Sequence, residues 1–395
     1  NTVDWLGLFG QVEYTAGAIT AYGMGGMTTV KYTYHDHFKA AANYDYSYAQ
    51  EKDGSDLDWV AANGKDETGG NPGELYIEAD PISTMQVKGG LMYDLGDAMS
   101  FFNVIPVFGK VYDNADLWFN FGLIDKAPVF DQVIQDWTGT MATDPANEKF
   151  TAFELGMNLS SNDGTMASKI NFYSTQWDDR IQTKSVQDQG DSTDDIIVYL
   201  SGISQAHSGV ELELAAQLNS MFRLDVGLGL GNWRFTDDAS GTYRDGSDEV
   251  TYSYALKDLP VGDMPQTNLL LGLTVKPVEG ATVQILHKTY MSHYSDWGLS
   301  SREYGDGDTP NRANPWQAPD YSVMDIHASY DLPFEFRGAN PALTLHVFNA
   351  LGADYIQDAV DNSRYNGWDS SSSAEDAEVF FGLPTSFNLG LRVNF

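Results

Sequence analysis

Apolar and polar residues alternate with a period of two along most of this chain, which is the pattern of a β-strand with one apolar face. The last segment shows it most regularly, with Phe387, Leu389, Leu391, Val393 and Phe395 on one face and polar residues or Gly on the other. Helical periodicity is scarcely visible between such segments. The same test predicts thirteen strands, at 4–14, 18–34, 84–95, 116–124, 149–159, 165–184, 194–216, 221–235, 267–277, 280–294, 321–332, 342–356 and 383–395. The pattern therefore predicts an all-β fold.

The lengths of the predicted strands favour a membrane barrel over a soluble sandwich. Several of them run for ten residues or more, whereas the strands of a sandwich typically have about 5 to 6 residues. A strand that crosses a bilayer needs about 9 to 11 residues. We therefore expect a transmembrane antiparallel β-barrel.

The links between the predicted strands alternate between long and short. The long links are mostly polar and lie at 35–83, 125–148, 185–193, 236–266, 295–320 and 357–382. The short links lie at 15–17, 160–164, 217–220, 278–279 and 333–341. Long loops on one side and tight turns on the other are the layout of an outer-membrane barrel, with the turns toward the periplasm. The link at 96–115 departs from this layout, because it is long although it falls on the turn side.

Composition and charge exclude several classes of protein. The chain has 56 acidic and 22 basic residues, a net charge of −34, and nucleic acid would be repelled by that charge. The absence of Cys excludes disulfides, thiolate metal sites and Cys nucleophiles. No apolar run approaches the roughly 18 to 20 residues of a membrane-spanning helix. Since the chain starts with Asn1, we expect that any targeting segment has been removed or was never part of it.

Candidate chemistry is sparse, and we expect no catalytic residues, no metal site and no cofactor. The sequence has no GxSxG nucleophile elbow, and the glycines at 227–231 lack the GxGxxG spacing of a phosphate-binding loop. His35 and His37 have a spacing that suits a divalent metal in an extended strand. Acidic loop residues such as Asp306 and Asp308 do not match the full spacing of a calcium loop. Solvated loop charge is the expected role of these groups.

Five segments, in this order, resemble one known family. They are WFNFGLIDKAPVFDQVI at 118–134, NEKFTAFELGMNLSSNDGTMASKINFYSTQWDDR at 147–180, HSGVELEL at 207–214, GDMPQ at 262–266 and LHVFNALGADYI at 345–356. They are similar to successive strands and loops in the C-terminal half of TonB-dependent outer-membrane receptors, especially those of the Bacteroidota. The resemblance covers most of the chain from residue 118 onward, and residues 1–34 more thinly. Each motif is short and weakly specific, so the resemblance to the family depends on their order.

The resemblance implies a barrel of about 22 strands, a plug domain in its lumen and a short segment that engages TonB. Neither the plug nor that segment is found in residues 1–395, so we expect the chain to be the C-terminal part of the barrel of a longer receptor. Thirteen strands are an odd number, which a single-chain bacterial barrel does not have. Either the chain contains a further strand that the alternation does not reveal, or it begins midway through a larger barrel.

The function implied by the resemblance is active uptake of a scarce nutrient, such as an iron chelate or an oligosaccharide, through the outer membrane of a Gram-negative bacterium. The expected partners are outer-membrane lipid, the TonB complex and the nutrient, with no nucleic acid and no enzymatic activity. Two alternatives stay open: a passive porin-like channel, and a barrel subunit or surface platform of a larger outer-membrane assembly. The acidic loops weakly disfavour anionic substrates.

The candidate substrate-binding residues are aromatic side chains in the long loops, because exposed rings stack on sugars or cover hydrophobic chelates. They are Trp59, Trp297, Tyr304, Trp316, Tyr365 and Trp368. The alternative, that these rings pack the loops on themselves, is at least as well supported. Trp177, which precedes Asp178, Asp179 and Arg180 at the outer end of a long strand, is interpreted as an aromatic-girdle residue beside a rim ion pair, with substrate contact as the alternative. Glu211 and Glu213 are placed on the lumen face, and Phe395 resembles the C-terminal aromatic that the outer-membrane insertion machinery recognises.

Overall fold

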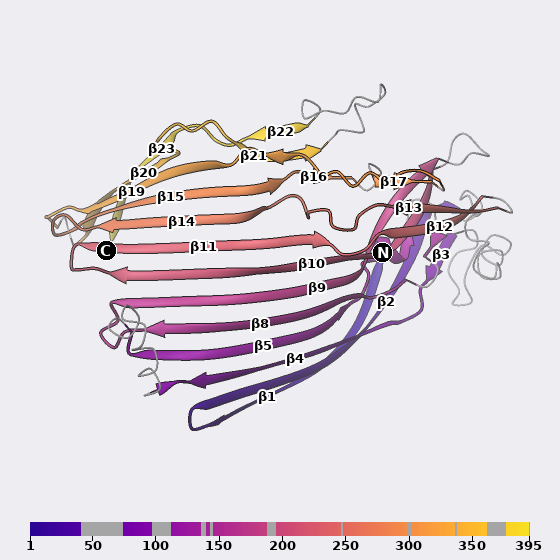
Figure 1. The fold of residues 1–395 in the computed structure, drawn as a ribbon, viewed down its shortest axis with the longest axis horizontal. Helices are drawn as coiled ribbons and strands as arrows, with labels where there is room; N and C mark the ends of the chain where they lie inside the picture. Colours follow the sequence, from indigo (N-terminus) through magenta and orange to yellow (C-terminus); the bar gives the residue numbers. More distant parts are fainter. Residues whose placement is uncertain are drawn as a thin grey trace.

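The chain folds into one large, curved antiparallel sheet (Figure 1). In this computed structural model the described residues are 1–40, 74–96, 112–135, 140–142, 145–187, 195–245, 248–298, 302–305, 307–335, 338–361 and 377–394. Within these ranges, no helix has the length and apolar character needed to cross a bilayer.

The long strands follow one another in chain order, and each pairs antiparallel with the next long strand. They are β1 (Thr2–Ala16), β2 (Ile19–Ala40), β4 (Ile82–Asp94), β5 (Asn114–Lys126), β8 (Glu148–Ser160), β9 (Met166–Gln187), β10 (Asp195–Gln217), β11 (Phe222–Phe235), β14 (Pro265–Val275), β15 (Ala281–Tyr294), β19 (Tyr321–Asp331), β20 (Asn340–Phe348) and β23 (Ser386–Asn394). Each strand range predicted from the sequence overlaps one of them, although many of the observed strands begin or end outside the predicted bounds. The all-β antiparallel prediction is therefore confirmed.

Several links that were predicted to be long loops contain short elements. These are β3 (Glu74–Glu78), α2 (Phe130–Val133), β6 (Ile134–Gln135), β7 (Thr140–Met141), β12 (Ala239–Asp245), β13 (Asp248–Tyr254), β16 (Asp296–Trp297), β17 (Glu303–Tyr304), β18 (Gln317–Ala318), β21 (Ile356–Asp361) and β22 (Glu378–Phe381). The link at 96–115 joins β4 to β5, which pair directly, and its residues 97–111 lie outside the described ranges. The long links therefore contain regular secondary structure in their described parts.

The predicted strand 342–356 is wrong in its second half. β20 ends at Phe348, because Asn349 and Gly352 have φ values of 47° and 65°, which turn the chain away from the extended conformation. Residues 356–361 then form β21, which belongs to a separate small sheet with β16 and β22.

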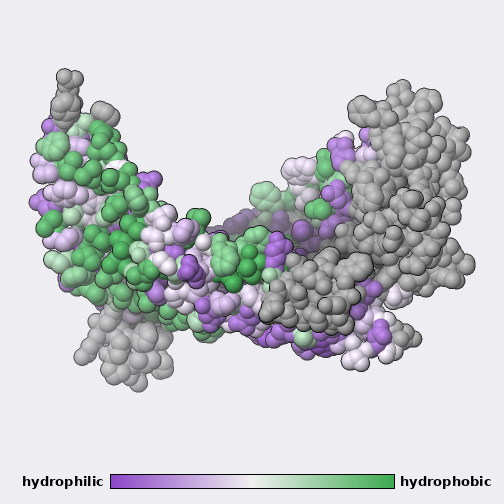
Figure 2. Space-filling view, turned by 90° about the horizontal axis from the view of Figure 1, so that it is seen from above, coloured by the Kyte–Doolittle hydropathy of each residue, from purple (hydrophilic) through white to green (hydrophobic). Residues whose placement is uncertain are grey.

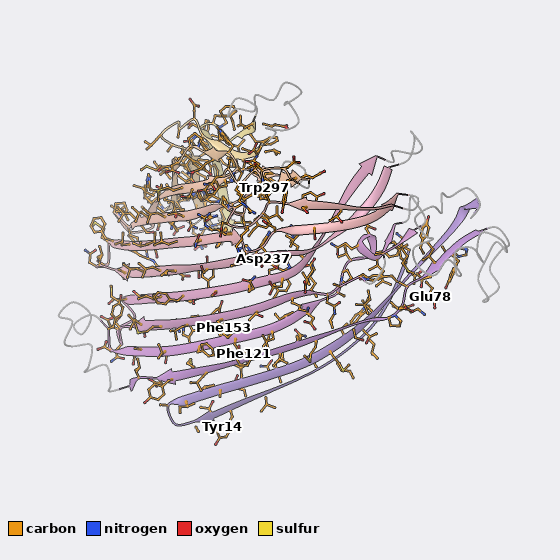
Figure 3. All side chains as sticks on the ribbon, turned by 45° about the vertical axis from the view of Figure 1, so that its right-hand side comes forward. Tyr14, Glu78, Phe121, Phe153, Asp237 and Trp297 are labelled. Atoms are coloured by element: carbon orange, nitrogen blue, oxygen red, sulfur yellow. The ribbon has the colours of Figure 1, made fainter. Side chains whose placement is uncertain are left out.

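The two faces of the large sheet differ in polarity. On one face, which we call the apolar face, Val226 of β11 lies opposite Leu214 of β10 and Leu271 of β14. Phe121 and Phe153 lie opposite each other on the same face of β5 and β8 (Figure 3). Many large apolar side chains on this face are exposed, among them Phe153 at 48%. An exposed apolar surface of this extent is typical of a protein that contacts lipid or a partner.

The opposite face, which we call the polar face, carries hydrogen-bonded amides and carboxylates. Asn120 Nδ2 donates to Glu154 Oε2 at 3.3 Å, and Asn171 Nδ2 donates to Glu211 Oε2 at 3.1 Å. Glu213 shares the face of Glu211 by strand alternation, as predicted. Aromatic rings also lie across this face, and the ring of Trp118 covers Gly156 so closely that a Cβ there would overlap it.

Polarity also changes along the strands. Figure 2 shows hydrophobic side chains gathered toward the end of the sheet where Figure 1 shows the tight turns, and hydrophilic ones toward the end that carries the long links. The sheet is therefore most apolar over its turn-side part.

Candidate functional site

Three of the six predicted substrate-binding residues can be placed, and all three lie in the link between β15 and β19. They are Trp297, Tyr304 and Trp316. Trp59, Tyr365 and Trp368 lie outside the described residues, as does Phe395. The functions of all seven residues stay predictions.

Trp297 packs in the interior of the loops. Its side chain is 9% exposed, its ring centre lies 5.2 Å from that of Phe235, and the guanidinium of Arg302 lies 5.3 Å from its centre. The indole N–H donates to the carbonyl oxygen of Pro260 at 3.4 Å. Figure 3 places Trp297 within a dense group of side chains. In this structure the ring serves packing between loops, which is the alternative that the sequence also allowed.

Tyr304 and Trp316 are only partly buried, and their backbones are anchored. Tyr304 pairs with Ser253 in the β13–β17 ladder. The backbone N–H of Trp316 donates to Asp361 Oδ2 at 3.0 Å, and its carbonyl accepts from the N–H of Ser295 at 2.8 Å. These two residues therefore combine a fixed backbone with a partly accessible ring.

An ion pair joins two of the long links. Arg312 donates to both carboxylate oxygens of Asp238, at 2.6 and 2.9 Å, and the backbone N–H groups of Leu256 and Lys257 donate to Asp238 Oδ1 at 3.0 Å. The hydrogen bonds from Arg312 are the main cause that lowers the pKa of Asp238 below its ordinary value of 3.8. The charged carboxylate therefore stabilises the contact between the two links.

Acid is expected to loosen this contact. Because the folded-state pKa of Asp238 lies below 3.8, its stabilisation is fully present above that pH and is lost as the pH falls through the folded-state value. We expect cleavage by pepsin within residues 236–266 to rise between about pH 4 and about pH 2. The variant Asp238→Asn should already be cleaved faster at the upper pH, because its neutral amide cannot pair with Arg312. Equal cleavage of the variant and the native chain there would contradict the prediction.

Trp177 lies on the polar face, so its assignment to a lipid-facing girdle is wrong. It pairs with Phe150 of β8, and the two rings stack with centres 4.9 Å apart. The indole N–H donates to Glu148 Oε2 at 3.2 Å, and the guanidinium of Arg180 lies 4.9 Å from the ring centre. Glu148 is 2% exposed and also accepts from Lys126 Nζ at 2.9 Å. The ring thus belongs to a polar network around the buried carboxylate of Glu148.

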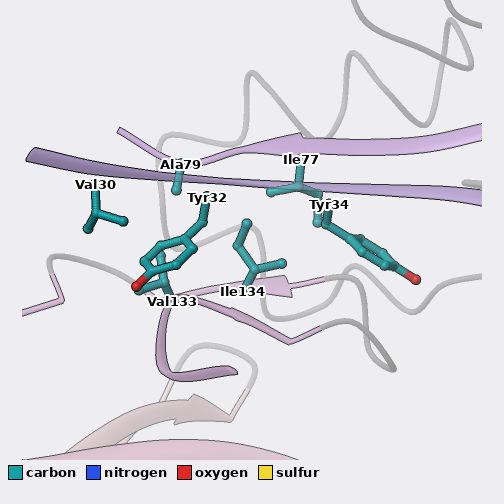
Figure 4. Close-up of a cluster of buried hydrophobic side chains, with 7 residues drawn as sticks. All are labelled: Val30, Tyr32, Tyr34, Ile77, Ala79, Val133 and Ile134. Carbon is teal, nitrogen blue, oxygen red and sulfur yellow. The ribbon is translucent and has the colours of Figure 1, made fainter. Parts of the chain in front are cut away.

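Part of the link between β5 and β8 folds over the polar face of β2. Val133 and Ile134 are fully buried against Val30, Tyr32 and Tyr34 (Figure 4). The Tyr32 hydroxyl donates to the carbonyl oxygen of Pro128 at 2.8 Å. This link therefore occupies space in front of the polar face.

A pocket of about 490 Å³ also opens on the polar face, and no pattern in the sequence pointed to it. Tyr290, Tyr321 and Tyr355 line it together with Lys288 and Asp325. The pocket lies near the ends of β15 and β19 that carry the long links, because Tyr290 pairs with Tyr321 four residues before β15 ends. Across the described ranges, no group of three or more His, Asp or Glu side chains could hold a metal ion.

Comparison with known proteins agrees with this architecture. Residues 1–351 match the family model described as TonB dependent receptor-like, beta-barrel. No curated protein matches the sequence.

Solved structures of receptors have a similar fold. The ferric-catecholate import receptor Fiu from K12 E. coli has a TM-score of 0.53 at 13% identity, with 98% of this chain and 44% of that chain covered. The copper transporter OprC has a TM-score of 0.56 at 13% identity, with 99% and 48% covered. The FrpB iron transporter from Neisseria meningitidis has a TM-score of 0.54 at 12% identity, with 98% and 44% covered. The chain thus spans less than half the length of each.

Since the family model covers residues 1–351, the chain belongs to the TonB-dependent receptor β-barrel family.

Proposed function

We propose that this chain is part of a receptor that actively takes up a scarce nutrient through the outer membrane of a Gram-negative bacterium, using energy delivered by TonB. The observation that carries the proposal is a sheet of long strands with an apolar face and a hydrogen-bonded polar face. In outer-membrane barrels the apolar face contacts lipid and the polar face lines the lumen. Membership of the receptor family supports the transport role.

We further propose that the full-length protein closes the barrel with strands outside residues 1–395, to a total of about 22. Within the described residues, β1 pairs only with β2, and β23 pairs only with β20 among the long strands. Lipid cannot satisfy the backbone groups of such edges. A plug in the lumen and a TonB-engaging segment belong to the same proposal. The kinship with receptors of the Bacteroidota rests on the sequence motifs alone.

The proposed nutrient contacts are the accessible loop aromatics. Tyr304 and Trp316 fit this role because their rings are partly exposed on anchored backbones. Trp59, Tyr365 and Trp368 stay in the proposal on the strength of their sequence context. Trp297 is assigned a packing role between the loops and not a nutrient contact, since only 9% of the residue is exposed.

Uptake by cells that carry the full-length receptor tests the function. The probes are a panel of iron chelates and neutral oligosaccharides, and uptake is compared in otherwise identical strains with and without TonB. We expect saturable uptake of at least one probe, lost when TonB is deleted, because only energised transport depends on TonB. Uptake that rises linearly with concentration and survives the deletion would instead identify a passive channel. A receptor that transports no probe in either strain would favour the surface-platform alternative.

A further inference from the structure

Three tyrosines on the polar face form a fixed row. The rings of Tyr321 and Tyr355 stack with centres 4.6 Å apart, and Tyr290 lies 5.1 Å from Tyr321. On its other side, Tyr355 lies against the backbone of Gly382, where a Cβ would overlap the ring. The row is therefore held by packing before any ligand arrives, which lowers the entropy cost of binding.

The hydroxyl groups of this row are available to a ligand. Across the described ranges, none of the three hydroxyls has a hydrogen-bond partner in the protein. None of them is a fully buried polar atom without a partner either, so all three are accessible. The three side chains line the same pocket. A phenolic hydroxyl both donates and accepts hydrogen bonds. The pocket therefore presents several two-way hydrogen-bonding groups at one place.

The charge of the pocket is balanced. Lys288 Nζ lies 2.7 Å from Asp325 Oδ2, and Asp325 Oδ1 accepts from the backbone N–H of Asn349 at 2.9 Å. The Lys288 charge is thus matched by a neighbouring carboxylate rather than left for a ligand. Since the chain as a whole carries a charge of −34, an anionic ligand would gain little from this site.

We propose that this pocket, which we call the tyrosine pocket (Tyr290, Tyr321, Tyr355, Lys288 and Asp325), binds a neutral carbohydrate ring of the transported nutrient. The proposal rests on the transport function proposed above and names its substrate class. A sugar ring offers hydroxyl groups that both donate and accept, together with C–H faces that pack on aromatic rings. The pocket volume of about 490 Å³ lies within the range of small-ligand sites.

Removing only the hydroxyls tests the proposal. The triple variant Y290F/Y321F/Y355F keeps the stacked rings, and Y330F is the matched control, because Tyr330 lies on the apolar face of the same strand, β19. The full-length receptor, purified in detergent, is titrated by calorimetry with neutral hexasaccharides built from glucose, xylose or mannose. We expect one of them to bind the native receptor, and the triple variant to raise its Kd by at least about tenfold, as the loss of several hydrogen bonds predicts. Y330F should leave Kd unchanged.

Two results would overturn the sugar assignment: no binding of any hexasaccharide by the native receptor, or an equal Kd for the native receptor and the triple variant. Heat-modifiable mobility reports whether the variants fold, and the single variant Y290F replaces the triple variant if the latter does not. The TonB experiment separates the two proposals. If the receptor transports an iron chelate in a TonB-dependent way and binds no sugar, the transport function stands and the sugar assignment falls.

Discussion

Replacing Val226 with Arg is expected to destabilise the folded barrel by about 2 to 4 kcal/mol, the cost of a basic side chain at mid-membrane on the lipid-facing side of a barrel. Val226 lies at the centre of an apolar patch, because it pairs with Leu214 and Leu271 and shares its face with Leu224 and Leu228. The free energy of unfolding is measured with denaturant in lipid vesicles, or as the surviving folded fraction if unfolding is irreversible.

The neighbouring position provides the matched control. Gly227 lies on the polar face, where it pairs with Glu213, and a Cβ there would meet Leu270 at an ordinary distance of 3.6 Å. Gly227→Arg should therefore cost much less than Val226→Arg, because its charge faces a carboxylate instead of lipid. Equal tolerance of Arg at the two positions would show that β11 is not embedded in lipid.

Replacing Gly156 with Ala is expected to lower the free energy of unfolding by about 1 to 3 kcal/mol, the usual cost of overpacking. The added methyl group would overlap the Trp118 ring and would also lie 2.9 Å from the carbonyl oxygen of Ile170. The ring and the backbone must both shift to admit it. Gly122→Ala is the control on the same face, since the nearest atom to its Cβ is 3.8 Å away.

A double-mutant cycle with Trp118→Ala identifies the cause of this effect. If the ring is the main obstacle, Gly156→Ala should cost clearly less when Trp118 is already Ala, with a partial cost left from the contact with Ile170. The same cost in both backgrounds would show that the ring yields freely and that the backbone contact dominates. Unfolding is followed as for Val226.

The sequence was sufficient to place the long strands, because alternation is a local property and a strand such as β11 shows it in its own residues. It was insufficient at Asn349 and Gly352, whose positive φ values end β20 within a segment that still looked strand-like. Trp177 was misassigned because its type and its place near the end of a strand suggested an interfacial ring, although alternation within β9 puts it on the same face as Asn171.

The tyrosine pocket shows why a candidate site is harder to predict than the fold. Tyr290 and Tyr321 are 31 positions apart in the chain and become neighbours only through the pairing of β15 with β19. Tyr355 joins them because the chain turns after Phe348. No local spacing contains this information. The candidate loop aromatics share only their position in the long links. Position alone does not distinguish a packed ring such as Trp297 from an accessible one.

Because apolar side chains are concentrated over the turn-side part of the sheet, the long-link ends of the strands are expected to extend above the membrane. β10 has 23 residues, which at about 3.3 Å per residue is a strand of about 75 Å. The apolar band of an outer-membrane barrel is about 25 Å tall, and a strand tilted by about 40° crosses it within about 33 Å. More than half of β10 therefore stands outside the hydrocarbon layer. Its upper part, which is paired with β9, extends into the aqueous medium. Under the proposed function, the nutrient would meet these paired strands before it reaches the level of the lipids.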